Sequence, residues 1–138
     1  MNLKHALSAG IMLLIICVAG GLYLYNKPHK SVADLDASIQ ISADSLYNDY
    51  QHNENNANKK YLNKIIEITG TISDIQNVNG SQIIQLSASQ SPGGISCRLF
   101  NNGNNKPITN KKNTTITVKG KCSGFLMDVD LVDCVVKN

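Results

Sequence analysis

The sequence predicts a mainly β chain, in which one apolar helix and one amphipathic helix precede five short strands. Three observations predict this class. The spacing of the apolar residues changes from about 3.6 to 2 at Ile65, as it does where a helix is followed by strands. The chain has no Trp and only two Phe, so its core depends on Ile, Val and Leu, which favour strands. A stretch of 20 residues near the N-terminus carries no charge.

The N-terminal segment is expected to be a transmembrane anchor or an uncleaved signal. Residues 1–5 form a short tail, and the uncharged residues 6–25 would form a helix of about 30 Å, the thickness of a hydrocarbon core. A cleaved signal peptide is the alternative, with Lys4 as its charged region and Ala19-Gly20-Gly21 as its small-residue site. Because most of the chain follows this helix, we expect a single-pass membrane protein whose C-terminal domain is exported.

Residues 26–41 are expected to form a linker, because they contain Pro28 and show no apolar period. Residues 42–138 are expected to form one domain that begins with an amphipathic helix. Ser42 has the side chain of a helix N-cap, and Asp44 complements the positive end of the helix dipole. The helix is predicted to end near residues 60–63, and its apolar stripe consists of Leu46, Tyr50, Ala57 and Tyr61.

Five strands are expected after this helix, over residues 65–75, 82–88, 95–100, 114–122 and 129–136. Asn79-Gly80 predicts a hairpin turn, and a slip in the alternation between Leu131 and Cys134 predicts a bulge. Gly70 inside the first strand and the long connection between the third and fourth strands are typical of an OB-fold, a five-stranded Greek-key barrel. An open five-stranded meander is the alternative.

Four stretches of the predicted domain have the order and spacing of a known family. The first stretch runs from Glu54 to Gly70, and its motif residues in between are Ala57, Tyr61, Lys64 and Glu67. The other three stretches are Ile95 to Phe100, Lys119 to Cys122, and Val129 to Cys134. Together they resemble the tRNA anti-like OB-fold proteins, which are small bacterial envelope or lipoprotein-like proteins. The resemblance covers about residues 41–137 and implies a fold, not an activity. The chain departs from a lipoprotein signal, because the bulky Ile16 precedes Cys17.

Three cysteines fall in three of the predicted strands: Cys97, Cys122 and Cys134. The chain lacks a CxxC pair, so no zinc site is expected. A hairpin that turns at residues 127–129 would place Cys122 opposite Cys134, which makes this pair the disulfide candidate in an exported domain. Three buried free thiols are the alternative.

An OB-fold binds ligands on the outer face of its second and third strands and on the adjoining loops. The candidate ligand-binding residues are therefore outward-facing: Gln85, Ser96, Arg98, Phe100, Lys119 and Lys121. Arg98 and Phe100 have side chains that stack on bases, and the lysines suit phosphates. Against nucleic acid, one aromatic residue makes a poor stacking platform, and Asp128 and Asp130 repel phosphates.

The domain itself is neutral, because Lys4, Lys27 and Lys30 around the apolar segment account for the formal net charge of +3. No catalytic residue, metal or cofactor is expected, since the sequence lacks a Ser-His-Asp order, a glycine-rich phosphate loop and HExxH. The sequence thus predicts a membrane-tethered, non-enzymatic binding module of the bacterial envelope, with an envelope protein or a small ligand as partner. Binding of single-stranded nucleic acid or tRNA on the face of strands two and three is the disfavoured alternative.

Overall fold

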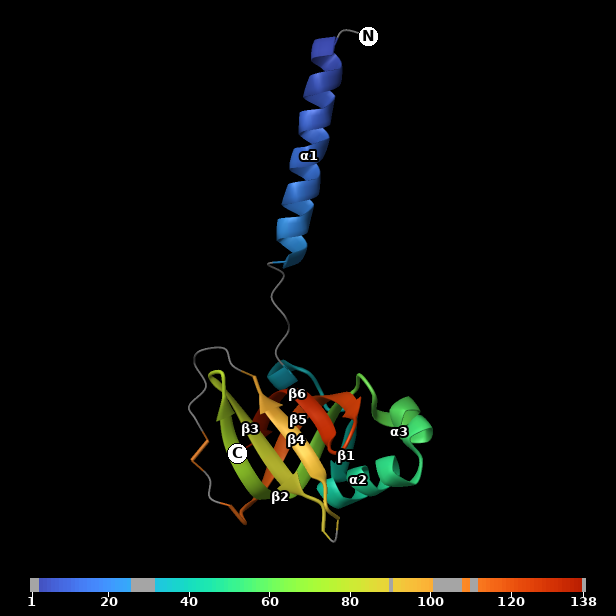
Figure 1. Ribbon diagram of the computed structural model, residues 1–138, viewed down its shortest axis with the longest axis vertical. Helices are drawn as coiled ribbons and strands as arrows, with labels where there is room; N and C mark the ends of the chain where they lie inside the picture. Colours follow the sequence, from blue (N-terminus) through green and yellow to red (C-terminus); the bar gives the residue numbers. More distant parts are fainter. Residues whose placement is uncertain (1–2, 26–31, 90, 101–107, 110–111, 138) are drawn as a thin grey trace. The chain divides into compact units, whose positions relative to one another are not determined.

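The computed structural model describes residues 3–25, 32–89, 91–100, 108–109 and 112–137 (Figure 1). The chain divides into two compact units, residues 1–30 and 31–138. In the first unit, α1 (Leu3–Tyr25) forms where a helix over residues 6–25 is expected. Its side chains are exposed from Gly10 to Tyr25. Although the sequence predicts a transmembrane anchor here, no helix among the described residues has the length and hydropathy needed to cross a membrane.

The second unit begins with a 3-10 turn, η1 (Val32–Asp34), and a short strand, β1 (Ile39–Ser42). Both lie where the sequence predicts a linker or its junction with the helix. β1 pairs in parallel with the next strand, with Ile39 opposite Ile66. The backbone N–H of Ser38 extends this pairing by donating to the Ile65 carbonyl at 2.9 Å. The C-terminal part of the expected linker is therefore a strand. Its four residues are too few for an alternation of apolar and polar residues to be recognised in the sequence.

Two helices follow where the sequence predicts one, α2 (Ala43–His52) and α3 (Glu54–Tyr61). Ser42 caps α2 as expected, because its Oγ accepts a hydrogen bond from the Ser45 N–H at 3.1 Å. The break between the helices lies at Asn53. Its backbone N–H donates to the Asp49 carbonyl at the end of α2, and its side chain accepts from the Asn56 N–H at 3.0 Å. Asn53 therefore satisfies backbone groups of both helices.

Five further strands close into a barrel, which confirms the predicted mainly β, OB-type architecture. Their bounds are β2 (Ile65–Val78), β3 (Ser81–Ser87), β4 (Gly94–Leu99), β5 (Thr115–Phe125) and β6 (Val129–Lys137). The sheet order is β1-β2-β3-β4-β6-β5, and the antiparallel pairing of β2 with β5 closes the barrel. β4 and β6 pair in parallel, which corresponds to the third and fifth strands of an OB-fold.

Two predicted backbone features are confirmed. Asn79 and Gly80 have φ angles of 50° and 77°, as a tight hairpin turn with positive φ at both central residues requires. In β6, the register with β5 shifts around Asp133, whose φ is 55°. The extra residue of this bulge turns Leu131 and Cys134 to the same side of the strand, so both are buried.

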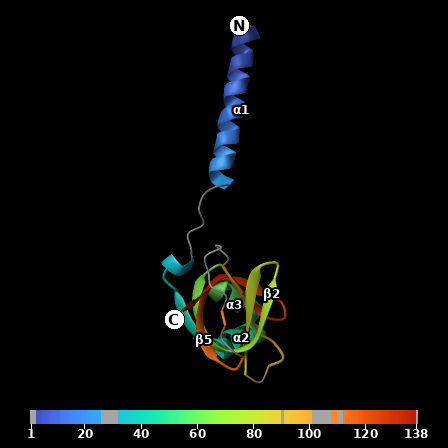
Figure 2. The same cartoon turned by 90° about the vertical axis from the view of Figure 1, so that its left-hand side faces the viewer.

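The core fills the barrel and continues under the two helices. Figure 2 shows α2 and α3 lying across one end of the barrel. The predicted apolar stripe of the helices is buried, with Leu46 and Tyr61 at 0% exposure. The Tyr50 ring stacks on Phe125 at a centroid distance of 5.4 Å. Gly70 allows α2 to approach β2, because a Cβ there would lie 2.8 Å from the Ala43 Cβ.

Candidate functional site

The outer face of β3 and β4 carries three of the six predicted ligand-binding residues. Gln85 of β3 lies opposite Ser96 of β4, and the neighbouring pair is Ile83 with Arg98. Gln85 and Ser96 are half-buried, whereas Arg98 is exposed. The alternation of the strands positions these side chains, since the intervening Ile84 and Cys97 point into the core.

Phe100 lies just after β4 and is half-buried. Its backbone N–H donates to the Cys134 carbonyl at 2.9 Å, which continues the pairing of β4 with β6 past the end of the strand. The half-buried ring does not provide the fully open face that a base-stacking platform presents.

Lys119 and Lys121 lie on another side of the barrel from Gln85, Ser96 and Arg98. Both are on β5, where they pair with Glu67 and Ile65 of β2. In the closed strand order, β2 separates β5 from β3, and β6 separates it from β4. The Lys119 Nζ donates to the Leu35 carbonyl at 2.8 Å, so this lysine holds the segment that precedes β1. The six predicted residues therefore do not form one surface.

A polar hollow of about 260 Å³ lies at the end of β3, and we call it the β3 hollow. One predicted residue, Gln85, lines it. The other lining residues come from β2, β3, the turn before β4 and the β5–β6 turn: Ser73, Asp74, Leu86, Ser87, Ser91, Pro92, Gly93, Gly94 and Asp128. Carboxylate, hydroxyl and amide groups thus surround a space large enough for a small molecule.

The walls of the β3 hollow are held together by hydrogen bonds. The Asp128 carboxylate accepts from the Gly94 N–H at 2.7 Å, which joins the β5–β6 turn to the start of β4. Asp74 pairs with Lys112 at 2.7 Å, and the hydrogen bond from Lys112 lowers the pKa of the Asp74 carboxyl. The Asp74 carboxyl is thus ionised at neutral pH and is paired with Lys112 at the wall of the hollow.

Sequence reasoning missed the carboxylates of the β3 hollow. In the sequence, Asp128 is interpreted as a group that repels phosphate and not as part of a ligand site on β3. Its place beside Gly94 follows from the parallel pairing of Ile95 with Val129, residues far apart in the chain. The turn Ser91-Pro92-Gly93-Gly94 is visible in the sequence, but the tight packing of Gly93 is not. A Cβ on Gly93 would lie 2.6 Å from the Met127 carbonyl oxygen.

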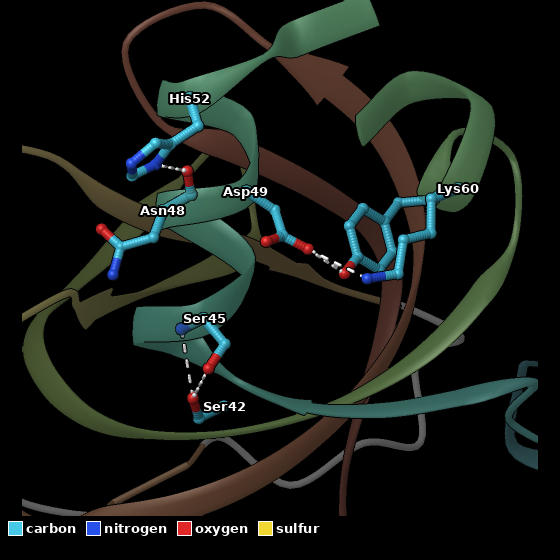
Figure 3. Close-up of polar contacts among 7 residues, drawn as sticks. Ser42, Ser45, Asn48, Asp49, His52 and Lys60 are labelled. Atoms are coloured by element: carbon cyan, nitrogen blue, oxygen red, sulfur yellow. Dashed lines mark hydrogen bonds and ion pairs between the residues drawn. The ribbon is translucent and has the colours of Figure 1, made fainter. Parts of the chain in front are cut away.

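A second hollow of about 280 Å³, the α2–α3 hollow, lies between the two helices and is lined by Asp49, His52, Asn53, Asn56, Ala57 and Lys60. Figure 3 shows polar contacts of the two helices, among them the contact of Asp49 with Lys60. The Tyr61 hydroxyl donates to Asp49 Oδ2 at 2.5 Å, and the Lys60 Nζ reaches the same oxygen at 3.1 Å. The Lys60 ammonium also lies 4.8 Å from the centre of the Tyr61 ring. This network fixes α3 to α2.

The network shifts the pKa values of its members in opposite directions. The hydrogen bond from Tyr61, followed by that from Lys60, lowers the pKa of the Asp49 carboxyl. Burial, followed by the hydrogen bond to Asp49, raises the pKa of the Tyr61 hydroxyl. Asp49 is thus ionised and Tyr61 neutral at pH 7. Because both polar partners of Asp49 are already in place, the geometry indicates a structural role.

The structure has Cys97, Cys122 and Cys134 as buried free thiols. The register expected for the disulfide candidate is wrong, because Cys122 lies opposite Leu131 and not opposite Cys134. The hairpin turns at residues 126–128, and the bulge at Asp133 adds a further offset. The Cys122 Sγ instead lies 3.3 Å from the Tyr50 hydroxyl. Within the described residues, no group of three or more His, Cys, Asp or Glu is placed to hold a metal ion.

Comparison with known proteins identifies the family. The model of the tRNA_anti-like family matches residues 1–136. The chain belongs to the tRNA_anti-like family. Within this tRNA_anti-like protein the match includes the closed barrel, both helices that cover its end, and the β3 hollow. No curated protein sequence matches the chain.

Among the solved structures, this tRNA_anti-like protein is similar in fold to a bacterial lipoprotein. The match is to the crystal structure of a proposed nucleic acid-binding lipoprotein from Klebsiella pneumoniae subsp. pneumoniae. The TM-score is 0.59 at 18% sequence identity, and the match covers 81% of this chain and 100% of that chain. At this identity the likeness supports the shared fold alone.

Proposed function

We propose that this protein is a non-enzymatic binding module that takes a small polar ligand in the β3 hollow. The observation that carries the proposal is the lining of this hollow, where the Gln85 amide lies with the Asp74 and Asp128 carboxylates and several serine hydroxyls. Such a lining offers many hydrogen-bond acceptors and two carboxylates, of which Asp74 is paired with Lys112. It suits a ligand that donates hydrogen bonds through hydroxyl or ammonium groups, and it repels phosphate.

A ligand screen on the full-length protein tests this proposal. Thermal shift would identify polyols, sugars and amines that stabilise the protein, and isothermal titration calorimetry would measure the affinity of each hit. Gln85→Ala should weaken binding by about tenfold, because one hydrogen bond in the site is lost. The matched control is Gln40→Ala on β1, an exposed glutamine outside the hollow, which should leave the affinity unchanged. Equal affinities in both variants and the parent would contradict the proposal.

Single-stranded nucleic acid on the β3–β4 face is the second candidate function. It is favoured by the adjacent Gln85, Ser96 and Arg98, and by the nucleic acid binding proposed for the Klebsiella lipoprotein. It is disfavoured because Lys119 and Lys121 lie on β5 and two carboxylates line the β3 hollow. Fluorescence anisotropy with short labelled RNA and DNA at about 50 and about 200 mM salt distinguishes the two functions.

We expect no nucleic-acid binding at tens of micromolar protein, even at the lower salt concentration. Micromolar binding that falls steeply with salt and weakens in Arg98→Ala would replace the small-ligand proposal with the nucleic-acid function. Lys64→Ala, which removes an exposed charge just before β2, is the control for a general loss of positive charge.

We further propose that the module is attached to the bacterial envelope through its N-terminal segment, with the C-terminal domain exported. Support comes from the 20 uncharged residues over 6–25, the exposed Leu13, Leu14 and Ile15 of α1, and the lipoprotein description of the similar structure. Cell fractionation of the full-length chain and of a chain without residues 1–30 tests attachment. Recovery of both chains in the same fraction would contradict it. Protease added outside spheroplasts should digest the C-terminal domain, and protection would contradict export.

A further inference from the structure

Cys97 and Cys134 lie on β4 and β6, the parallel pair of strands in the barrel. Both side chains are fully buried and belong to the same core cluster. Cys97 is opposite Leu131, and Cys134 is opposite Leu99, so the cysteines are diagonal neighbours across adjacent strands. The bulge at Asp133 turns Cys134 to the inner side, where Cys97 also points.

The two thiols are in contact. A hydrogen bond joins the side chain of Cys134 to that of Cys97. Cys122 has a different surrounding, because it lies on β5 opposite Leu131 and contacts the Tyr50 hydroxyl at 3.3 Å. Of the three core cysteines, Cys97 and Cys134 are therefore the pair that combines adjacent strands, a shared inner side and a side-chain interaction, which are the conditions that favour a disulfide.

We propose that Cys97 and Cys134 form a disulfide when the chain folds in the presence of a small-molecule disulfide oxidant, and that Cys122 remains a thiol. One cysteine thiolate attacks the oxidant and forms a mixed disulfide, which releases one oxidant thiol. The second cysteine thiolate then attacks the mixed disulfide and releases the other oxidant thiol. The two cysteines lose two electrons and two protons in total, and the oxidant gains them as two S–H groups.

The oxidation should take place during folding, because both thiols are fully buried once the core has formed. Burial, followed by the hydrogen bond with Cys97, raises the pKa of the Cys134 thiol, and the thiolate is the reactive form. The bond would close a loop of roughly 38 residues and join the two parallel strands covalently. The oxidised protein should therefore have a Tm several degrees above that of the reduced protein.

The experiment uses the full-length chain with Cys17→Ser, which removes the exposed cysteine of α1. The denatured, reduced protein is refolded in detergent with oxidised and reduced glutathione, and the remaining thiols are then alkylated under denaturing conditions. Intact mass should show a loss of about two mass units and a single alkylated cysteine. A product with three alkylated cysteines would overturn the proposal.

Peptide mapping identifies the bonded pair without relying on any cysteine variant in the core. Trypsin cleaves after Arg98 and Lys121, and cyanogen bromide after Met127, so the three core cysteines fall in three separate peptides. We expect residues 65–98 linked to residues 128–137, with alkylated Cys122 on residues 122–127. A link to residues 122–127 would overturn the proposal. As a matched set, Cys122→Ser should keep the loss of mass, and Cys97→Ser should abolish it.

Discussion

Gly120 lies on β5 at a point where the core has no room for a side chain. A Cβ there would lie 2.5 Å from the Cys134 Sγ and 3.2 Å from a methyl carbon of Leu131. Gly120→Ala is therefore expected to lower the free energy of unfolding by about 1–3 kcal/mol, because β5 or β6 must shift. Urea denaturation followed by circular dichroism measures the change.

The Gly120→Ala prediction has an internal control. Combined with Cys134→Ala, the substitution should cost less, because the atom nearest to the new methyl group is then absent. An equal cost with and without the sulfur atom would show that the close contact with Cys134 is not the cause.

Because of Asp49, the free energy of unfolding of the domain is expected to depend on pH in the acid range. Tyr61 and Lys60 hold the pKa of this carboxyl below its usual value in the folded state. The resulting stabilisation is present above the unfolded pKa of about 4 and is lost as pH falls toward the lower folded pKa. Tyr61→Phe should cost about 1 kcal/mol at pH 7, a modest value because the Asp49 side chain is 43% exposed. At pH 3 the cost should be smaller. Urea titrations at both pH values measure it, and equal costs would contradict the mechanism.

Asn53 joins two helices by capping both. Asn53→Ala removes the side-chain acceptor of the Asn56 N–H and should lower the free energy of unfolding by about 1 kcal/mol. The matched control is Asn55→Ala, an exposed position within α3, where the higher helix propensity of Ala should leave stability unchanged or slightly raised. Thermal unfolding of the two variants makes the comparison. Equal melting temperatures would show that the Asn53 cap contributes nothing.

The elements that could be predicted from the sequence are those determined by local patterns. The five barrel strands, the Asn79-Gly80 turn and the bulge near Asp133 follow from alternation and turn chemistry. The break at Asn53 was missed because the apolar stripe continues across it into α3. β1 was missed because it has four residues and depends on β2 for its pairing.

The contacts that could not be predicted depend on which strands meet in space. The expected pairing of Cys122 with Cys134 assumed a regular hairpin, whereas the bulge and the parallel pairing of β4 with β6 bring Cys134 to Cys97.

The residues of the candidate site also depend on which strands are adjacent in the barrel. Gln85 and Ser96 were predicted to lie on one face and do, because adjacent antiparallel strands align them. Lys119 was placed with them although closure of the barrel puts β5 elsewhere.

At the scale of the whole molecule, the core residues that the structure describes all belong to the second unit, from Ala43 onward. A chain that lacks residues 1–30 should therefore unfold cooperatively, with a Tm within about 3 °C of the full-length protein, since a difference of 1 kcal/mol corresponds to about 4–8 °C for a domain of this size. Differential scanning calorimetry of both chains in the same detergent measures this. A Tm lowered by more than about 8 °C would show that the N-terminal unit contributes to the folded domain.

β2 takes part in three pairings, with β1, β3 and β5. Its partner β3 follows directly after a tight turn, but β5 is distant in the chain, as the Thr69–Thr117 hydrogen bond across 48 residues shows. Local hairpins form in microseconds, whereas pairings between distant residues must first overcome the entropy of closing a long loop. During synthesis, one edge of β2 thus lacks its partner until β5 has been made. In this interval the nascent chain exposes an unpaired strand edge, which favours aggregation. Rapid synthesis of β5, or a chaperone that covers the edge of β2, would prevent this aggregation.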